Sequence, residues 1–125
     1  MSKENWPDWD VYIKGKCRCV YCGLDGATGL DVWNQLDIDH LIPKCRGGTN
    51  SPINKVVTCL RCNLMKGSYD PQGYESDPPK WVEPPDVEER KRLIEVAKAY
   101  IQRSRKQMDA DFRQMLCEIH CEPSA

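Results

Sequence analysis

Long apolar runs are scarce in this sequence of 125 residues, and Phe occurs only once. No apolar stretch approaches the roughly 20 residues that a membrane-spanning helix needs, so we expect no membrane contact. The first ten residues, MSKENWPDWD, lack the apolar segment of a signal peptide. These absences predict a cytoplasmic protein with a small core, and small cores usually need an additional stabilising device.

A strong net charge is also lacking, because the formal net charge is −1. Overall charge therefore argues for no particular class of partner, but its distribution is uneven. Residues 11–69 hold eight Lys or Arg and four Asp, whereas residues 1–10 and 70–125 are acidic overall. The central segment is the part that would attract a polyanion, and only mildly.

Three segments follow one another along the chain. Residues 11–69 contain two Cys-x-x-Cys pairs and all the residues with evident chemistry; residues 70–86 contain five prolines and predict an extended connector. Residues 87–121 contain neither Pro nor Gly, which favours a helix. The connector and the helix are expected to belong to the same single domain as the first segment.

The central segment has mixed α+β character. LDIDHLI (36–42) alternates in polarity and is predicted to be a strand, PKCRGGTNSPIN (43–54) a loop, and KVVTCL (55–60) a second strand. RCNLMKGSY (61–69) is predicted to begin a short helix that ends near Gly67. The predicted order is strand, loop, strand, helix.

Apolar residues recur at helical spacing over residues 93–119, although the stripe weakens at Ser104 and Gln107. The pattern allows one long helix or two. Asp86 and Glu89 form a plausible capping pair at its start. One uninterrupted helix would be about 50 Å long at 1.5 Å per residue. Since this exceeds what a small core covers, the stripe allows a homodimer through the helix.

The chain contains eight cysteines. Cys19 with Cys22 and Cys59 with Cys62 form two Cys-x-x-Cys pairs with 36 residues between them. This spacing is typical of a structural Zn²⁺ site with four thiolates, and such a closed site leaves no position for a substrate. The alternatives are unrelated thiols or a redox pair. Cys17 could also replace Cys19, through a less regular spacing.

Asp39 and His40 stand side by side at the end of the first predicted strand. A single His is more often structural than catalytic, but polar residues recur nearby. Asn54 follows in the loop, and Asn63 comes directly after the second cysteine pair. A metal held by the cysteines would fix the helix that carries Asn63 near the strand that carries Asp39 and His40. A rigid support of this kind is what a preorganised site requires.

The chain at this point resembles the HNH nucleases with a ββα-metal fold, in their bacterial and phage branch with zinc knuckles. The resemblance covers residues 19–69 and is carried by the order and spacing of its motifs. These are Asp39-His40, Ile42-Pro43, Gly47-Gly48, Asn54, CLRCN (59–63) and Lys66-Gly67. It implies a small ββα-metal core and a metal-dependent endonuclease that hydrolyses DNA.

The resemblance also implies roles for single residues. His40 would be the general base that activates water. Asp39 and Asn63 would bind one Mg²⁺ or Mn²⁺, since hard oxygen ligands suit these ions better than Zn²⁺. Asn54 would either hydrogen-bond to the loop backbone or orient the ring of His40, without touching the metal. The main alternative is a catalytically inactive, zinc-stapled module that binds nucleic acid.

Four basic residues surround these positions and are candidate contacts to phosphates, namely Lys44, Arg46, Arg61 and Lys66. Each of them is equally well explained as a solvated surface charge. A third possibility for the whole chain is a zinc-stapled scaffold whose C-terminal helix recruits a partner.

Overall fold

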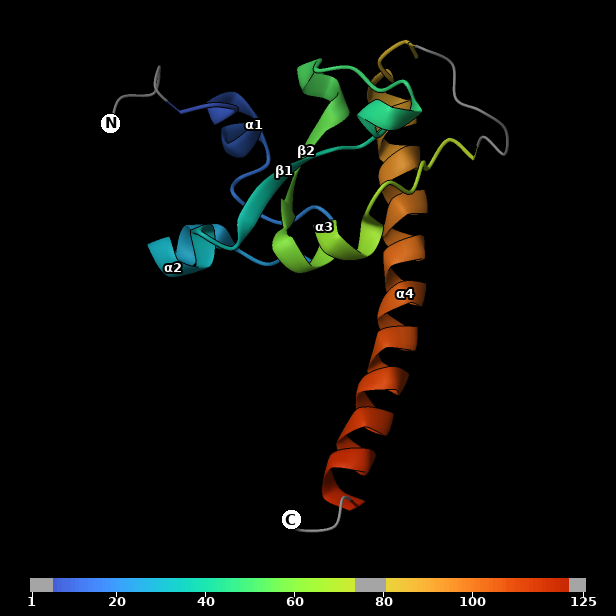
Figure 1. Ribbon diagram of the computed structural model, residues 1–125. Coiled ribbons are helices and arrows are strands. Elements are labelled where there is room, and N and C mark those ends of the chain that lie inside the picture. Colours follow the sequence, from blue (N-terminus) through green and yellow to red (C-terminus); the bar gives the residue numbers. More distant parts are fainter. Residues whose placement is uncertain (1–5, 74–80, 122–125) are drawn as a thin grey trace.

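A two-stranded antiparallel sheet followed directly by a short helix forms the centre of the computed structural model, which describes residues 6–73 and 81–121 (Figure 1). The predicted α+β class, with its strand, loop, strand and helix in that order, is confirmed. The helices and strands are α1 (Trp9–Lys14), α2 (Leu30–Trp33), β1 (Leu36–His40), β2 (Lys55–Cys59), α3 (Leu60–Lys66) and α4 (Val87–Cys121). The short helices α1 and α2 were not predicted. Residues 74–80 of the predicted connector lie outside the described residues.

The register of the sheet places Asp39 opposite Val56 and His40 opposite Lys55. Because successive side chains of a strand point to opposite faces, Asp39 and His40 leave the sheet in different directions. Asp39 is buried and His40 is partly exposed. The two neighbours in the sequence therefore meet different surroundings.

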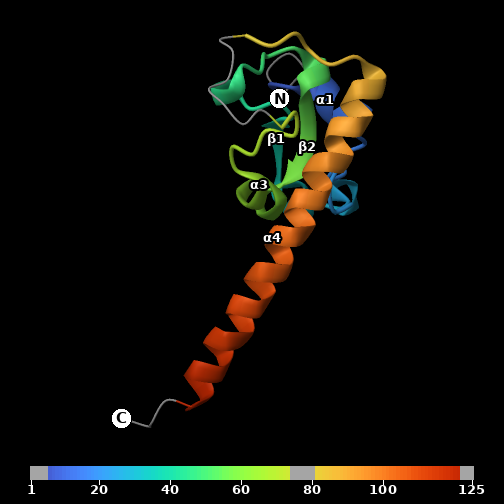
Figure 2. The same ribbon diagram turned by 90° about the vertical axis from the view of Figure 1, so that its right-hand side faces the viewer.

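The long helix α4 is a single helix of 35 residues, which settles the choice between one helix and two. Its first half belongs to the core: Leu93, Ile94, Ala97 and Ile101 are all buried, and α4 packs against α3. Its second half extends away from the rest of the molecule (Figures 1 and 2). The large apolar residues of that half are exposed, namely Met108, Phe112, Met115, Leu116 and Ile119.

The start of α4 is capped as the sequence suggests, but only in one direction. The Glu89 N–H donates to Asp86 Oδ1 at 2.8 Å, which satisfies one of the free donors of the first turn. The Glu89 carboxylate does not return the bond, because it pairs with Arg92 one turn later. Among the described helices, none has the length and apolarity to cross a membrane.

The loop between the strands is held by the side chain of Asn54, which is 1% exposed. Its Oδ1 accepts from the Ile42 N–H at 2.8 Å, and its Nδ2 donates to Ile42 O at 3.0 Å and to Thr49 O at 2.9 Å. The amide thus takes the place of a strand partner for Ile42. This explains why β1 ends at His40, two residues earlier than predicted.

Gly48 is required by the same arrangement. A Cβ atom at this position would lie 1.8 Å from Ile42 O and 3.0 Å from Asn54 Nδ2, which no backbone adjustment of a few tenths of an ångström can relieve. Its neighbour Gly47 has φ 90°, a conformation that disfavours other residues. The double glycine therefore lets the loop close over Asn54.

We expect Asn54→Ala to lower the free energy of unfolding by about 2 kcal/mol or more, because it leaves the two buried backbone groups of Ile42 without their side-chain partner at roughly 1–3 kcal/mol each, and also removes the bond to the partly buried Thr49 O. Urea denaturation followed by circular dichroism measures this. Asn34→Ala, at an exposed amide, is the matched control and should change stability by less than about 0.5 kcal/mol. Equal stabilities of the two variants would contradict the role given to Asn54.

Candidate active site and cysteine cluster

The carboxylate of Asp39 is held from two sides inside the protein. The Tyr21 hydroxyl donates to Asp39 Oδ2 at 3.2 Å, and Lys66 Nζ lies 3.0 Å from the same oxygen. Among the described residues both contacts go to Oδ2, so Oδ1 is the oxygen left to bind an ion. The contacts fix the orientation of the carboxylate.

The contact of Lys66 with Asp39 was not predicted from the sequence. Its side chain has 0% exposure, and besides Asp39 its ammonium group donates to the backbone oxygen of His40 at 3.2 Å. This corrects the expectation that Lys66 is a surface residue in contact with phosphate, because no phosphate can reach a buried and ion-paired ammonium. Lys66 instead joins α3 to the end of β1.

Burial raises the pKa of the Asp39 carboxyl, and the charge and hydrogen bond of Lys66 oppose that rise without cancelling it. Burial, together with the neighbouring Asp39, raises the pKa of the Tyr21 hydroxyl far above its ordinary value. Tyr21 is therefore a permanent hydrogen-bond donor at neutral pH. Burial thus makes the ionised form of Asp39 costly in free energy, and the neighbouring Lys66 ammonium offsets part of that cost.

The ring of His40 is oriented by Asn50, whose Oδ1 lies 2.9 Å from Nε2. With the amide in this orientation, Nε2 carries the proton and donates it to Asn50. The tautomer follows from the assigned direction of the amide. Nδ1 then keeps its lone pair and is the atom that can accept a proton.

Asn54 and Asn63 differ in what the structure shows for them. Asn54 contacts the loop backbone, which is the first of the two roles expected for it, and the ring of His40 is contacted by Asn50 instead. Asn63 lies on α3 and is partly exposed. It precedes Lys66 by three residues, so the two share one side of the helix, and the Lys66 contact turns that side towards Asp39.

The other three basic residues lie in different surroundings. Lys44 is exposed in the loop. Arg46 Nε lies 3.5 Å from Asp70 Oδ2, where Asp70 is buried. Arg61 is exposed; slight burial lowers the pKa of its guanidinium, but the sulfurs of Cys59 and Cys22 outweigh this and raise the pKa overall. Lys44 and Arg46 thus belong to the loop between the strands, and Arg61 belongs to the start of α3.

Four cysteine sulfurs converge where β2 meets α3: those of Cys19, Cys22, Cys59 and Cys62 lie within 4.8 Å of one another. Cys22 Sγ and Cys59 Sγ are 3.7 Å apart. Metal–sulfur bonds of about 2.3 Å in a tetrahedron require sulfurs roughly 3.8 Å apart, so the spacing fits a metal ion. Cys17, the alternative to Cys19, is not part of this cluster, and no disulfide forms between the cysteines of the described chain.

The two Cys-x-x-Cys turns have the same local design. The Cys22 N–H points at Cys19 Sγ at 3.5 Å, and the Cys62 N–H points at Cys59 Sγ at 3.4 Å. Gly23 ends the first turn with φ 82°, as expected for a tight turn at this position. Amide donors of this kind stabilise thiolates.

The acidities of the thiols differ within the cluster. Burial raises the pKa of Cys19, but hydrogen bonds from the backbone outweigh it and bring the pKa to about 7. For Cys62, burial and the neighbouring sulfurs both raise the pKa. Four thiolates at this spacing repel one another, so the full set needs a compensating cation. This donor set suits a soft divalent ion.

Two residues of the site were missed by sequence reasoning. Tyr21 lies inside the first Cys-x-x-Cys pair, where the sequence gives no sign that its hydroxyl reaches Asp39. Asn50 follows the double glycine in a loop rich in polar residues, any of which could face the ring of His40. No local sequence pattern marks Tyr21 or Asn50, because each contacts a residue that lies at a distance from it in the sequence.

The comparisons with known proteins concern the segment that carries this site. Residues 19–69 match the family model of the HNH endonucleases. A stretch of 53 residues is 36% identical to the CRISPR-associated endonuclease Cas9 of Corynebacterium diphtheriae. That stretch is 42% of this chain and 4% of Cas9, so the chain spans only a small part of this relative. No solved structure matches the chain. Residues 19–69 thus form a domain of the HNH endonuclease family.

Proposed function

We propose that this protein is a divalent-metal-dependent endonuclease that hydrolyses phosphodiester bonds in DNA. The observation that carries the proposal is the arrangement around Asp39 and His40 within a domain of the HNH family. A carboxylate oxygen remains for an ion, and an oriented imidazole with an available Nδ1 stands next to it in the chain. The matched relative, Cas9, is likewise named an endonuclease.

The general base in this proposal is Nδ1 of His40. It takes a proton from the attacking water, and Asn50 holds the ring while the positive charge forms. An imidazole is suited to this task near neutral pH. General-base catalysis of this kind typically contributes about 10²- to 10⁴-fold to the rate.

The metal ligands in this proposal are Asp39 Oδ1 and the amide oxygen of Asn63, on the side of α3 that faces Asp39. Hard oxygen ligands favour Mg²⁺ or Mn²⁺. When bound, such an ion stabilises the charge on the scissile phosphate and on the leaving oxygen. Tyr21 and Lys66 hold the carboxylate in place through Oδ2. Because the Lys66 ammonium attracts the same carboxylate, we expect only modest metal affinity.

The cysteine cluster would hold one structural Zn²⁺, which has the ligand type and geometry that the four sulfurs offer. Cys59 ends β2 and its sulfur caps the start of α3, so the ion would fix the helix that carries Asn63 and Lys66. Its role is in folding and in positioning the site. Chemistry on a substrate is excluded by the closed ligand set.

Nicking of supercoiled plasmid tests the proposed activity. We expect nicking with added Mg²⁺ or Mn²⁺ and none when these ions are left out or removed with EDTA. Because a chelator can also remove the structural Zn²⁺, circular dichroism distinguishes loss of the catalytic ion from loss of the fold. The alternative is a catalytically inactive zinc-stapled module, which would bind DNA and leave the plasmid intact under all these conditions.

Three substitutions separate the proposed catalytic roles. His40→Ala should lower the nicking rate by about 10²-fold or more and keep Mn²⁺ binding, because it removes the proton acceptor. Asp39→Ala and Asn63→Ala should weaken Mn²⁺ binding, and excess Mn²⁺ should partly restore their cutting. Because Asp39→Ala also leaves the buried Lys66 ammonium without its carboxylate, circular dichroism checks that this variant is folded. Calorimetric titration of Mn²⁺ is paired with the nicking rates.

Asn50→Ala adds a further comparison, because it removes the partner of Nε2 without touching either proposed metal ligand. It should slow nicking and leave Mn²⁺ affinity unchanged. If His40→Ala lost Mn²⁺ binding while Asp39→Ala kept it, the two roles would be reversed. Parental nicking rates in all four variants would place the active site elsewhere.

Purified protein should contain about one zinc per chain by elemental analysis. Cys59→Ser should be insoluble or lack a cooperative unfolding transition, because the binding energy of a structural metal is also folding energy. Cys45→Ser, at an exposed cysteine outside the cluster, is the matched control and should keep both zinc and stability. A well-folded Cys59→Ser protein without zinc would refute the structural site.

The distal half of α4 carries the proposal of a homodimer, because five large apolar side chains are exposed along it. Truncation after Gln107 removes that stripe and keeps Leu93, Ala97 and Ile101 in the core. Light scattering should show a dimer for the full chain and a monomer for the truncated one. A monomeric full chain at high micromolar concentration would instead leave this face to a different partner, as in a scaffold.

A further inference from the structure

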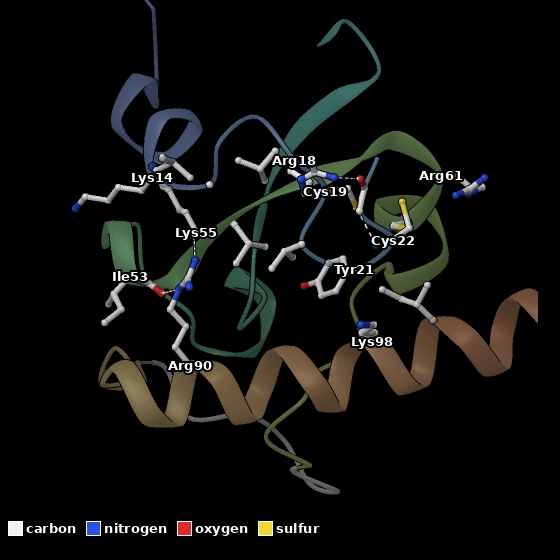
Figure 3. A pocket seen from close by; sticks show the side chains of 18 of the residues that line it. Lys14, Arg18, Cys19, Tyr21, Cys22, Ile53, Lys55, Arg61, Arg90 and Lys98 are labelled. Carbon is white, nitrogen blue, oxygen red and sulfur yellow. Dashed lines mark hydrogen bonds between the residues drawn. The ribbon is translucent and has the colours of Figure 1, made fainter. Parts of the chain in front are cut away.

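A groove of about 1150 Å³ runs between α4 and the opposite wall, which consists of α1, the first cysteine turn and α3 (Figure 3). Neither Asp39, His40 nor Asn63 lines it. Tyr21 is shared, since its side chain lines the groove while its hydroxyl bonds to Asp39. The groove is therefore a feature separate from the candidate active site and adjoins it through one side chain.

The groove is predominantly positive: its lining contains seven Lys or Arg residues and one carboxylate, that of Asp10. Three cysteines of the metal cluster, Cys19, Cys22 and Cys62, also line it, and a Zn²⁺ site with four thiolates would offset two of the positive charges. These cations come from α1, the first cysteine turn, β2, α3 and α4, so segments far apart in the sequence converge on one space. In Figure 3, Arg90 extends from α4 towards Lys55.

Four of the seven cations have partners within the protein. Arg18 pairs with Asp25 at 3.1 Å and Lys55 with Asp8 at 2.7 Å. Arg90 donates to the backbone oxygens of Ile53 and Lys55 at 3.2 and 3.3 Å, and Arg61 faces the cysteine sulfurs. These four are explained by the fold.

The remaining three, Lys14, Lys98 and Arg105, form no ion pair with any residue that the structure describes. Lys98 and Arg105 are seven residues apart, so they lie on one face of α4, about 10 Å from each other along the helix axis. Lys14 belongs to the opposite wall and is exposed. Cations that line one groove without an acidic partner leave a positive potential there, and a bound anion compensates it.

The shape of the groove indicates a polymeric anion. Its volume exceeds the roughly 300–1,000 Å³ of pockets that enclose a small ligand. Phosphates of a nucleic acid strand follow one another every few ångströms, so cations about 10 Å apart can contact two phosphates of one strand that are not direct neighbours. Apolar residues such as Val57 and Ile101 line the groove between the charges, as suits sugars and bases.

We propose that this groove binds the phosphate backbone of a nucleic acid strand, as a second contact outside the catalytic residues. The inference rests on the proposed nuclease function for the choice of nucleic acid over other polyanions. Contacts to phosphate position a nucleic acid without reading its sequence. The groove would thus hold a part of the DNA outside the bond that is cut.

Fluorescence anisotropy with labelled single- and double-stranded DNA, without added Mg²⁺ or Mn²⁺, tests this separately from cleavage. The double variant Lys98→Glu, Arg105→Glu should bind at least about tenfold more weakly than the parent near 0.1 M salt. Its slope of log K against log salt should fall by about 2, close to one unit for each lost phosphate contact. The maximal nicking rate at saturating DNA should be retained.

Lys91→Glu, Arg113→Glu is the matched control, because it changes the net charge equally on the same helix outside the groove. It should keep the parental salt slope. Lys14→Glu, from the opposite wall, repeats the test if the α4 variant fails to fold, and should lower the slope by about one. Equal slopes for the groove and control variants would overturn the proposal.

Two further outcomes are informative. If the parent binds DNA through the groove but never nicks it, the nuclease function fails and the groove stands. If polyglutamate binds the parent and labelled DNA does not, the groove receives an acidic protein segment, and the assignment to nucleic acid is overturned.

Discussion

The ammonium group of Lys66 ties the helix α3 to the end of β1, and the candidate site depends on that connection. A buried charge is costly unless it is paired and hydrogen-bonded, and Lys66 has both Asp39 and the backbone oxygen of His40 as partners. Removing either charge would leave the other buried without compensation, at a cost of roughly 3–5 kcal/mol. The pair of Lys66 and Asp39 therefore fixes the geometry of the site and also stabilises the fold.

The helix α3 is held at both ends. It has seven residues, far fewer than the roughly 12–15 that an isolated helix needs to be even marginally stable in water. Its start is fixed at the cysteine cluster through Cys59 and Cys62, and its end is fixed by Lys66. Asn63 lies between these two anchors, so its position follows from theirs.

Sequence reasoning predicted the parts of this molecule that depend on local patterns. Two strands, the helix after them and the long C-terminal helix each have a periodicity or a spacing that can be read directly, as do the Cys-x-x-Cys pairs. The contacts of Lys66, Tyr21 and Asn50 could not be predicted, because each side chain acts on a residue distant in the sequence. The helices α1 and α2 are too short, at six and four residues, to show an apolar period. The basic groove was hidden for a related reason, since its cations are scattered from Lys14 to Arg105 and meet only in the folded chain.

The division of α4 into a packed half and a projecting half has a consequence for local opening. Amides near Leu93 and Ala97 lie against the core, so they exchange with solvent deuterium only when the whole domain unfolds. Beyond Ile101 the helix continues for about 30 Å with support only from pairs such as Arg113 with Asp109, each worth a few tenths of a kcal/mol. In the monomer this half therefore unwinds and re-forms independently of the core. One continuous helix thus contains two cooperative units, and the boundary between them lies where its buried face ends.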